Sequence, residues 1–190
     1  TNANTLPAGD YKIFESKSPD GYMMEGTLER TFSIKENGVI VDLTGSKSAI
    51  LNDVIRGGVK ISKRDYELKE TVALGDASLG NAEFSIITLN QNTVLVDGKE
   101  YSYGQVAKKI VTDDETKIAS TAADTLPRGH YRIVESKVPE GYLMQGILVQ
   151  EFDIVEDGVI VDLTDADHSI QDQVKRGDFD ITKIDSSSQN

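Results

Sequence analysis

The sequence predicts an all-β protein: an antiparallel sandwich that recurs as a tandem repeat of 120 residues. Short segments of alternating apolar and polar residues follow one another, separated by turn signals rich in Gly, Pro, Asn and Asp. The chain also aligns with itself, because residues 1–65 match residues 121–185 without a gap and 34 of the 65 positions are identical. Many short strands at this spacing are typical of an antiparallel sandwich.

Individual strands are expected where the alternation is clearest. These segments are AEFSII (82–87), HYRIVES (130–136), EFDIV (151–155), VIVDL (159–163) and the stretch near Ser169–Lys175. The turn signals between strands are VDGK (96–99), LPRG (126–129), VPEG (138–141) and EDG (156–158). The segment GQVAKKIV fits either a strand or a single helical turn, and we favour the strand.

The repeat divides the chain into three parts. Residues 57–176 are expected to form one complete unit, residues 1–56 the C-terminal half of a truncated unit, and residues 177–190 the first strand of a following unit. No Gly/Ser-rich or Pro-rich tether separates the units, because the last strand runs through Arg176 and Gly177 into the next first strand. Such short joints predict a stiff chain of domains.

Composition excludes several classes of function. A net charge of −12 disfavours nucleic acid and anionic membranes as partners, and 38% hydrophobic residues are enough for a packed core. The chain has no cysteine and no apolar run long enough to cross a bilayer, so we expect no disulfide, thiol nucleophile or membrane insertion. No cofactor or metal site is expected either, since His130 and His168 correspond to Asp10 and Ser48 in the other copy.

A lysine occupies a position where an apolar residue is expected. In GVKISKRD, Lys63 has the same strand parity as Val59 and Ile61, so it faces the core if they do. The repeat selects this lysine, because Lys183 stands at the corresponding position of the other copy.

Two further polar residues have core-facing parity. They are Glu135 in the segment YRIVE and Asp172 in the segment SIQDQVK, and Gln171 is then expected to look outward. The leading copy repeats the pattern with Glu15 and Asn52. Each unit is therefore predicted to bring a lysine, a glutamate and an Asn or Asp to the core side of three strands.

Three interpretations of this pattern stay open on the residues alone. The residues could be unrelated and lie near strand ends, where long side chains reach back to water. Lys63 could form a buried salt bridge with Glu135, with Asp172 as a third member, because isolated buried charges are costly. Alternatively, burial favours an uncharged Lys63 amine and a protonated Glu135, and the amine attacks the side-chain carbonyl of Asp172. The product is an isopeptide bond, formed with loss of water, or of ammonia where Asn52 is the acceptor.

The same residues carry a resemblance to a known family. LPRGHYRIVESKVPEGY, with Glu-Ser before a Pro-x-Gly-Tyr turn, resembles the E-box of Cna B-type domains. GGVKISKRD and DQVKRGDFDITK resemble the junctions between tandem repeats of that family. Repeats of this kind build pilins and adhesin stalks on the surfaces of Gram-positive bacteria.

The resemblance implies a prealbumin-like variant of the immunoglobulin sandwich and assigns roles to the polar residues. The family's functional positions fall on the isopeptide donors Lys63 and Lys183, the catalytic glutamates Glu135 and Glu15, and the acceptors Asp172 and Asn52. Asp172 departs from the family pattern, in which Asn is the commoner acceptor.

We therefore expect a structural stalk or pilin-type repeat, located extracellularly at the cell wall or surface of a Gram-positive bacterium. It would be stabilised by a self-formed Lys–Asp or Lys–Asn bond, with neighbouring repeats of the same chain as partners and no turnover of a substrate. The alternative is an adhesive module that recognises host matrix protein or glycan through its loops, with the region 66–120 as the candidate surface and the loop at 97–105 as the place to test it.

Overall fold

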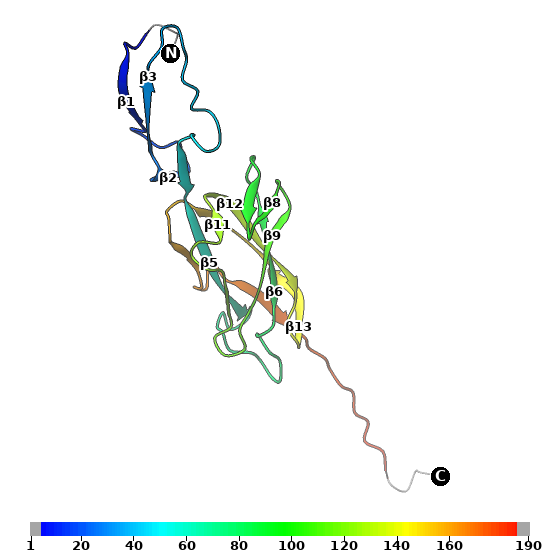
Figure 1. Cartoon of the computed structure of the whole chain (residues 1–190). Helices are drawn as coiled ribbons and strands as arrows, with labels where there is room; N and C mark the ends of the chain where they lie inside the picture. The colour runs from blue at the N-terminus through cyan, green and yellow to red at the C-terminus, as the bar shows by residue number, and fades with distance from the viewer. Residues whose placement is uncertain (1–4, 186–190) are drawn as a thin grey trace.

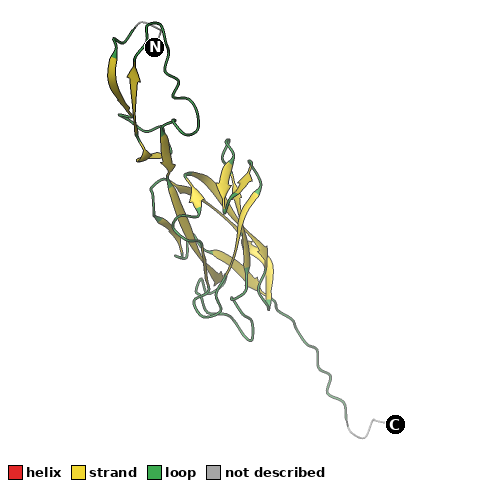
Figure 2. Ribbon diagram, in the orientation of Figure 1, coloured by secondary structure: helices red, strands yellow, loops and turns green. Residues whose placement is uncertain are grey.

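The computed structural model describes residues 5–185. Every regular element in this range is a strand, and no helix occurs in it (Figure 2). Two parts lie end to end along an elongated molecule, and residues 177–185 extend away from the second part as a single segment (Figure 1). We call β1 to β4 the leading segment and β5 to β16 the sandwich.

The leading segment contains two strand pairs, β1·β3 and β2·β4. Its strands are β1 (Gly9–Phe14), β2 (Tyr22–Thr27), β3 (Glu29–Ile34) and β4 (Leu51–Val54).

The sandwich consists of two main sheets and one hairpin. The first sheet contains β5 (Arg56–Asp65), β10 (Ile118–Ser120), β11 (Leu126–Pro127), β13 (Tyr142–Ile147), β15 (Ile160–Leu163) and β16 (Ile170–Val174). The second sheet has the order β14-β12-β6-β9, from β6 (Glu83–Thr88), β9 (Val106–Val111), β12 (Gly129–Lys137) and β14 (Val149–Ile154). The hairpin joins β7 (Val94–Val96) to β8 (Lys99–Tyr101).

Local sequence signals locate most of these elements. The predicted all-β sandwich is confirmed, and the ambiguous segment at 104–111 forms β9. The turn signal VDGK becomes the two-residue hairpin between β7 and β8, in which Asp97 and Gly98 have φ values of 50° and 75°. Positive φ at both central residues is the feature of a type I′ turn, which suits the right-handed twist of paired strands.

One sheet is mixed and not purely antiparallel. β5 runs parallel to β15 and to β16, while the other pairings of the sandwich are antiparallel. Residue alternation fixes which face a side chain takes but carries no information about the direction of a partner strand. The consequence is that the first and last strands of the sandwich lie side by side and point the same way, so the chain enters at one pole and leaves at the other.

The hydrophobic core lies between the two main sheets. Val59 and Ile61 on β5 are fully buried, as are Phe84 on β6 and Tyr131 and Ile133 on β12. The alternation of β5 therefore points inward as predicted, and it directs the next residue of the same parity, Lys63, into the same interior.

Pairings in the leading segment repeat those of the sandwich at an offset of 120 residues. β1 pairs with β3 in the register that β12 and β14 share, and β2 pairs with β4 as β13 does with β16. Only Ile55 separates β4 from β5, and its carbonyl accepts a hydrogen bond from the Arg128 N–H, 2.8 Å away. The Arg128 side chain also forms an ion pair with Asp20, so Arg128 connects the sandwich to the leading segment through both its backbone and its side chain.

Residues 177–185, where a first strand of a following unit is predicted, form no strand. A strand needs a neighbour to satisfy its N–H and C=O groups, and within residues 5–185 no strand pairs with this segment. Residues 186–190 of that prediction lie outside the described range.

Candidate functional site

The structure places Lys63, Glu135 and Asp172 together in the interior of the sandwich. Lys63 Nζ lies 2.9 Å from Glu135 Oε1 and 2.6 Å from Asp172 Oδ1, and all three side chains are fully buried. Lys63 and Asp172 come from the adjacent strands β5 and β16, whereas Glu135 reaches them from β12 in the opposite sheet. We call these three residues the buried cluster.

The distances between the polar atoms of the buried cluster are short, but these contacts do not have the geometry of hydrogen bonds. Lys63 Nζ and both carboxylate oxygens of Glu135 and of Asp172 have no hydrogen-bond partner of normal geometry. A buried ion pair is stabilising only when further hydrogen bonds satisfy its remaining protons and lone pairs. The cluster is therefore poorly built as a stabilising salt bridge, although an amine and a carboxyl group meet in it at contact distance.

Burial changes the protonation of the glutamate. It raises the pKa of Glu135 to about 8, the adjacent Asp172 adds to the rise, and the charge of Lys63 opposes it. Glu135 is thus mainly protonated at neutral pH. With Glu135 protonated, a Lys63 ammonium and an Asp172 carboxylate hold the same total number of protons as an uncharged amine beside a carboxylic acid. Transfer of one proton inside the cluster therefore creates a nucleophile without exchange with solvent.

A glycine on the neighbouring strand allows close packing at Asp172. Gly146 on β13 pairs with Asp172 next to a break in register and has φ +138°. A Cβ added to Gly146 would overlap the carbonyl oxygen of Gln171. Analysis of the sequence alone missed this residue, although the signal was present: both copies of the repeat keep a glycine here, the other being Gly26.

The sequence did not reveal that Tyr142 on β13 pairs with Asp65 at the end of β5. The Tyr142 hydroxyl donates a hydrogen bond to Asp65 Oδ2 at 2.9 Å, and Asp65 Oδ1 accepts from the backbone N–H groups of Glu67 and Leu68. Burial raises the pKa of Tyr142 to about 12, so the hydroxyl keeps its proton and remains a donor. These bonds fix the end of β5 two residues beyond Lys63.

The prediction for Gln171 was wrong. Its parity predicts an outward-facing side chain, but only 1% of the residue is exposed. The loop that precedes β16 folds back over this face, and Gln171 Nε2 donates to the Ser169 hydroxyl at 3.2 Å and to the Ala166 carbonyl. Parity identifies the face correctly, but it cannot show that a loop covers the face.

The other predicted site residues, Glu15, Asn52 and Lys183, do not come together as Lys63, Glu135 and Asp172 do. In the leading segment Asn52 Nδ2 donates to Glu15 Oε2 at 2.5 Å and to the Met23 carbonyl at 3.1 Å. Lys183 is exposed in the segment 177–185, which extends from the end of the sandwich opposite to the leading segment (Figure 1). The leading copy therefore has its glutamate and acceptor in contact, without a lysine.

Within residues 5–185 the structure shows no group of three or more acidic or histidine side chains placed to hold a metal ion. The same range contains no helix of the length and apolarity needed to cross a membrane. The adhesive alternative rests on the loop at 97–105, where Tyr103 is exposed, and recognition of a ligand there stays a prediction.

The all-β sandwich with parallel first and last strands agrees with the prealbumin-like structural domain that the resemblance implies. The model of the family SpaA, a prealbumin-like fold domain, matches residues 60–168, more than half of the chain. The chain belongs to this family, and the resemblance to Cna B-type domains is confirmed. Domains of this family are structural and not enzymatic, as predicted.

A comparison with solved structures found similar chains. The chain is 27% identical to the Bacillus anthracis TIE protein with a TM-score of 0.52, covering 89% of this chain and 26% of that one. It is 20% identical to a streptococcal ancillary pilin with a TM-score of 0.41, covering 90% of this chain and 43% of that one. It is also 20% identical to BcpA, the major pilin subunit of Bacillus cereus, with a TM-score of 0.43, covering 78% of this chain and 43% of that one. The chain thus spans between a quarter and a half of these proteins. No curated protein matched the sequence.

Proposed function

We propose that the chain is a structural repeat of a stalk or pilin-type protein on the surface of a Gram-positive bacterium. Residues 57–176 form its complete unit, with residues 1–56 and 177–190 belonging to neighbouring units. An intramolecular isopeptide bond between Lys63 and Asp172, formed by the domain itself, locks the unit. The observation that carries the proposal is the buried cluster, which brings an amine and a carboxyl from the first and last strands within 2.6 Å.

The chemistry balances within the cluster. The uncharged Lys63 amine attacks Cγ of Asp172, and a new C–N bond replaces one C–O bond. Protonated Glu135 donates a proton to the departing hydroxyl and recovers one from the attacking nitrogen, so one water molecule leaves and Glu135 is unchanged. Because the two groups are held in contact, the step is intramolecular and gains the corresponding effective molarity.

The position of the bond suits a load-bearing role. Asp172 lies 109 positions after Lys63, and β5 and β16 run parallel, so pulling on the two ends of the unit shears these strands past each other. With the bond in place, tension passes along β5 to Lys63, across to Asp172 and out through β16. Residues 64–171 then carry no load. A bond without sulfur also resists reducing agents, which fits a chain with no cysteine.

Intact-mass spectrometry tests the proposal directly. The folded chain is expected to weigh one water molecule less than its sequence, and proteolysis should release one branched peptide that contains both Lys63 and Asp172. Lys63→Met should have the full sequence mass. Lys60→Met is the matched control on the same strand, because Lys60 is partly exposed and pairs with Asp162, so it should keep the loss of water. An unmodified mass in a folded wild-type sample at neutral pH would refute the bond.

A further inference from the structure

A second aspartate lies beside the buried cluster. Asp65 and Asp172 are both fully buried, and they stand directly opposite each other in the parallel pairing of β5 with β16. Asp65 also has the same strand parity as Lys63, so both of these side chains enter the interior from β5. The interior therefore offers the Lys63 amine two aspartate carboxyl groups, one from its own strand and one from the adjacent strand.

The strand register places the Lys63 amine at the level of both aspartates. Lys63 is paired with Ile170, whereas Asp172 is paired with Asp65, two residues further along β5. Because Lys63 Nζ lies 2.6 Å from Asp172 Oδ1, the lysine side chain extends forward over the rise of about 6.6 Å that separates two such residues. Within residues 5–185, however, Lys63 forms ion pairs only with Glu135 and Asp172. The structure thus keeps Asp65 away from an amine that has reached its level.

Hydrogen bonds distinguish the two aspartates. Asp65 Oδ1 accepts from the backbone N–H groups of Glu67 and Leu68 at 2.8 and 2.9 Å, and Asp65 Oδ2 accepts from the Tyr142 hydroxyl at 2.9 Å. Neither carboxyl oxygen of Asp172 has a hydrogen-bond partner of normal geometry. An ionised carboxyl group only accepts hydrogen bonds, and all three donors hold Asp65 in that role. Asp172 has no such donors and is free to take up a proton.

The Tyr142 hydroxyl is oriented by contacts on both of its sides. Its oxygen accepts the Leu74 N–H at 3.3 Å, and its ring is fully buried on β13, the strand next to β16. Burial raises the pKa of Tyr142 to about 12, and the charges of Asp65 and Asp172 add to the rise. The hydroxyl therefore keeps its proton and directs it to Asp65, although it lies close enough to Asp172 to be influenced by that charge.

We propose that Tyr142 is a positioning residue that determines which aspartate is joined to Lys63. Its hydrogen bond keeps Asp65 as an anion, so the proton that leaves the Lys63 ammonium passes to Asp172. Asp172 then carries a hydroxyl that can leave as water, whereas ionised Asp65 carries none. This inference rests on the Lys63–Asp172 bond proposed above, and it assigns to that reaction a residue outside the buried cluster.

Removal of the Tyr142 hydroxyl has a defined chemical consequence. In Tyr142→Phe one oxygen of Asp65 loses its donor in a dry interior, and the Lys63 ammonium at the same level is a donor that can replace it. The proton then stays on Lys63 or passes to Asp65. In both cases Asp172 remains a carboxylate, which resists attack by an amine because it has no hydroxyl to lose. This diversion moves one proton and changes no covalent bond, so the chain keeps its full mass until it is linked.

Asp65→Asn separates this role from packing. The oxygen of the Asn side chain can still accept from the two backbone N–H groups, but its amide cannot take up the Lys63 proton. Tyr142→Phe should slow linking at least about tenfold, and Asp65→Asn added to it should restore the rate to within about twofold of the wild type. A tyrosine that acted only by filling space would show no such rescue, because the second substitution returns no packing.

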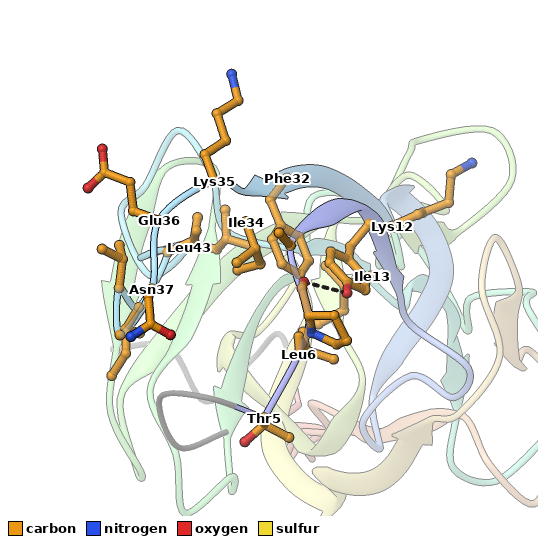
Figure 3. A pocket seen from close by; sticks show the side chains of 17 residues that line it. Thr5, Leu6, Lys12, Ile13, Phe32, Ile34, Lys35, Glu36, Asn37 and Leu43 are labelled. Atoms are coloured by element: carbon orange, nitrogen blue, oxygen red, sulfur yellow. Dashed lines mark hydrogen bonds between the residues drawn. The ribbon is translucent and has the colours of Figure 1, made fainter.

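Tyr131→Phe is the matched control. Tyr131 is also fully buried in the sandwich, and its hydroxyl donates to the Pro127 carbonyl at 2.7 Å. The leading segment forms the same bond between Tyr11 and Pro7, which the dashed line in Figure 3 marks. Because the bond also forms in the copy whose acceptor contacts no lysine, it belongs to the fold and not to the linking chemistry. Tyr131→Phe loses one buried hydrogen bond, as Tyr142→Phe does, but should link at the wild-type rate.

The experiment follows linking in full-length chains over time. Each variant is made by cell-free synthesis at neutral pH, samples are stopped with denaturant, and intact mass gives the fraction of chains that has lost one water. Slow linking of Tyr142→Phe, with rescue by Asp65→Asn and no effect of Tyr131→Phe, supports the inference. Linking of Tyr142→Phe at the wild-type rate, or no rescue, overturns it and leaves the bond standing. A folded wild type with its full sequence mass overturns the bond and the inference together.

Folding is measured separately, on chains that cannot link. Circular dichroism melts of Lys63→Met, alone and combined with Tyr142→Phe or Tyr131→Phe, give the loss of stability that each phenol causes without any linking. If Tyr142→Phe does not fold, Asp65→Asn with Tyr142 intact decides the question. It removes the competing carboxyl and leaves Lys63 and Asp172 in place, so it should link at the wild-type rate and only at Asp172. A loss of rate of about tenfold would show that Asp65 itself takes part, and would overturn the inference.

Discussion

Replacing the whole buried cluster by apolar residues distinguishes a covalent lock from a buried salt bridge. In the triple variant Lys63→Met, Glu135→Met and Asp172→Val, no charge remains in the buried cluster and no bond can form. Replacing a buried ion pair by apolar groups of similar size is often neutral or stabilising by about 1–4 kcal/mol. If the cluster is only a salt bridge, the triple variant should be at least as stable as the wild type.

The covalent lock predicts the opposite sign. By analogy with a disulfide, closing a loop of the 109 positions between Lys63 and Asp172 lowers the entropy of the unfolded chain by an amount worth about 5 kcal/mol at 25 °C. An unfolding entropy of about 2 cal/mol/K per residue gives about 0.25 kcal/mol/K for a unit of this size. The triple variant should therefore melt about 20 °C below the linked wild type.

Circular dichroism melts of both proteins measure this difference, and intact masses from the same samples show which are linked. Lys60→Met is the control, since its ion pair is exposed to solvent and its loss should shift the melting temperature by no more than a few degrees. A triple variant that melts at or above the wild type, with the wild type showing its loss of water, would refute the stabilising role of the bond.

Three further predictions follow from the geometry. Bond formation, measured by mass after cell-free synthesis and folding at different pH values, should slow as pH rises through about 8, because Glu135 then loses its proton. Before linking, the free energy of unfolding should also fall between about pH 4.5 and 8, since only the folded state holds that proton in this range. A rate of bond formation that does not change up to pH 9.5 would contradict the role of Glu135. Gly146→Ala should destabilise the unit by about 2–4 kcal/mol in urea titrations. The control Gly158→Ala should cost about 1 kcal/mol, because Gly158 also has a positive φ but has free space around it. Equal losses of stability in the two variants would contradict the close approach of β13 to β16. Under force, the unlinked Lys63→Met sandwich should release about 400 Å of chain in single-molecule stretching, whereas the linked wild type should release almost none.

Much of the buried cluster could be predicted from the sequence because strand parity is a local property. Lys63, Glu135 and Asp172 each share a face with apolar neighbours in their own strands, and the structure places all three inside. The repeat removed the main ambiguity, since it separated Lys63 from Lys60. The chemical roles of these residues stay predictions until the mass of the chain is measured.

What the sequence could not show is set by contacts between distant segments. Parity does not reveal that β5 lies parallel to β16, which decides how force acts on the bond. Nor does it reveal that a loop covers Gln171. Residues 177–185 show the limit most plainly, because they repeat the pattern of β5 but form no strand.

The proposed bond also accounts for why a domain would bury such an unfavourable cluster. As separate groups, Lys63, Glu135 and Asp172 place three ionisable side chains in a dry interior with few suitable hydrogen bonds. Formation of the amide removes the amine and one carboxyl, and the remaining Glu135, whose pKa is raised, stays uncharged at neutral pH. A neutral amide and a neutral acid can hydrogen-bond each other without a desolvated charge. The linked cluster therefore keeps no buried ion, and its energetic penalty exists only until the bond has formed.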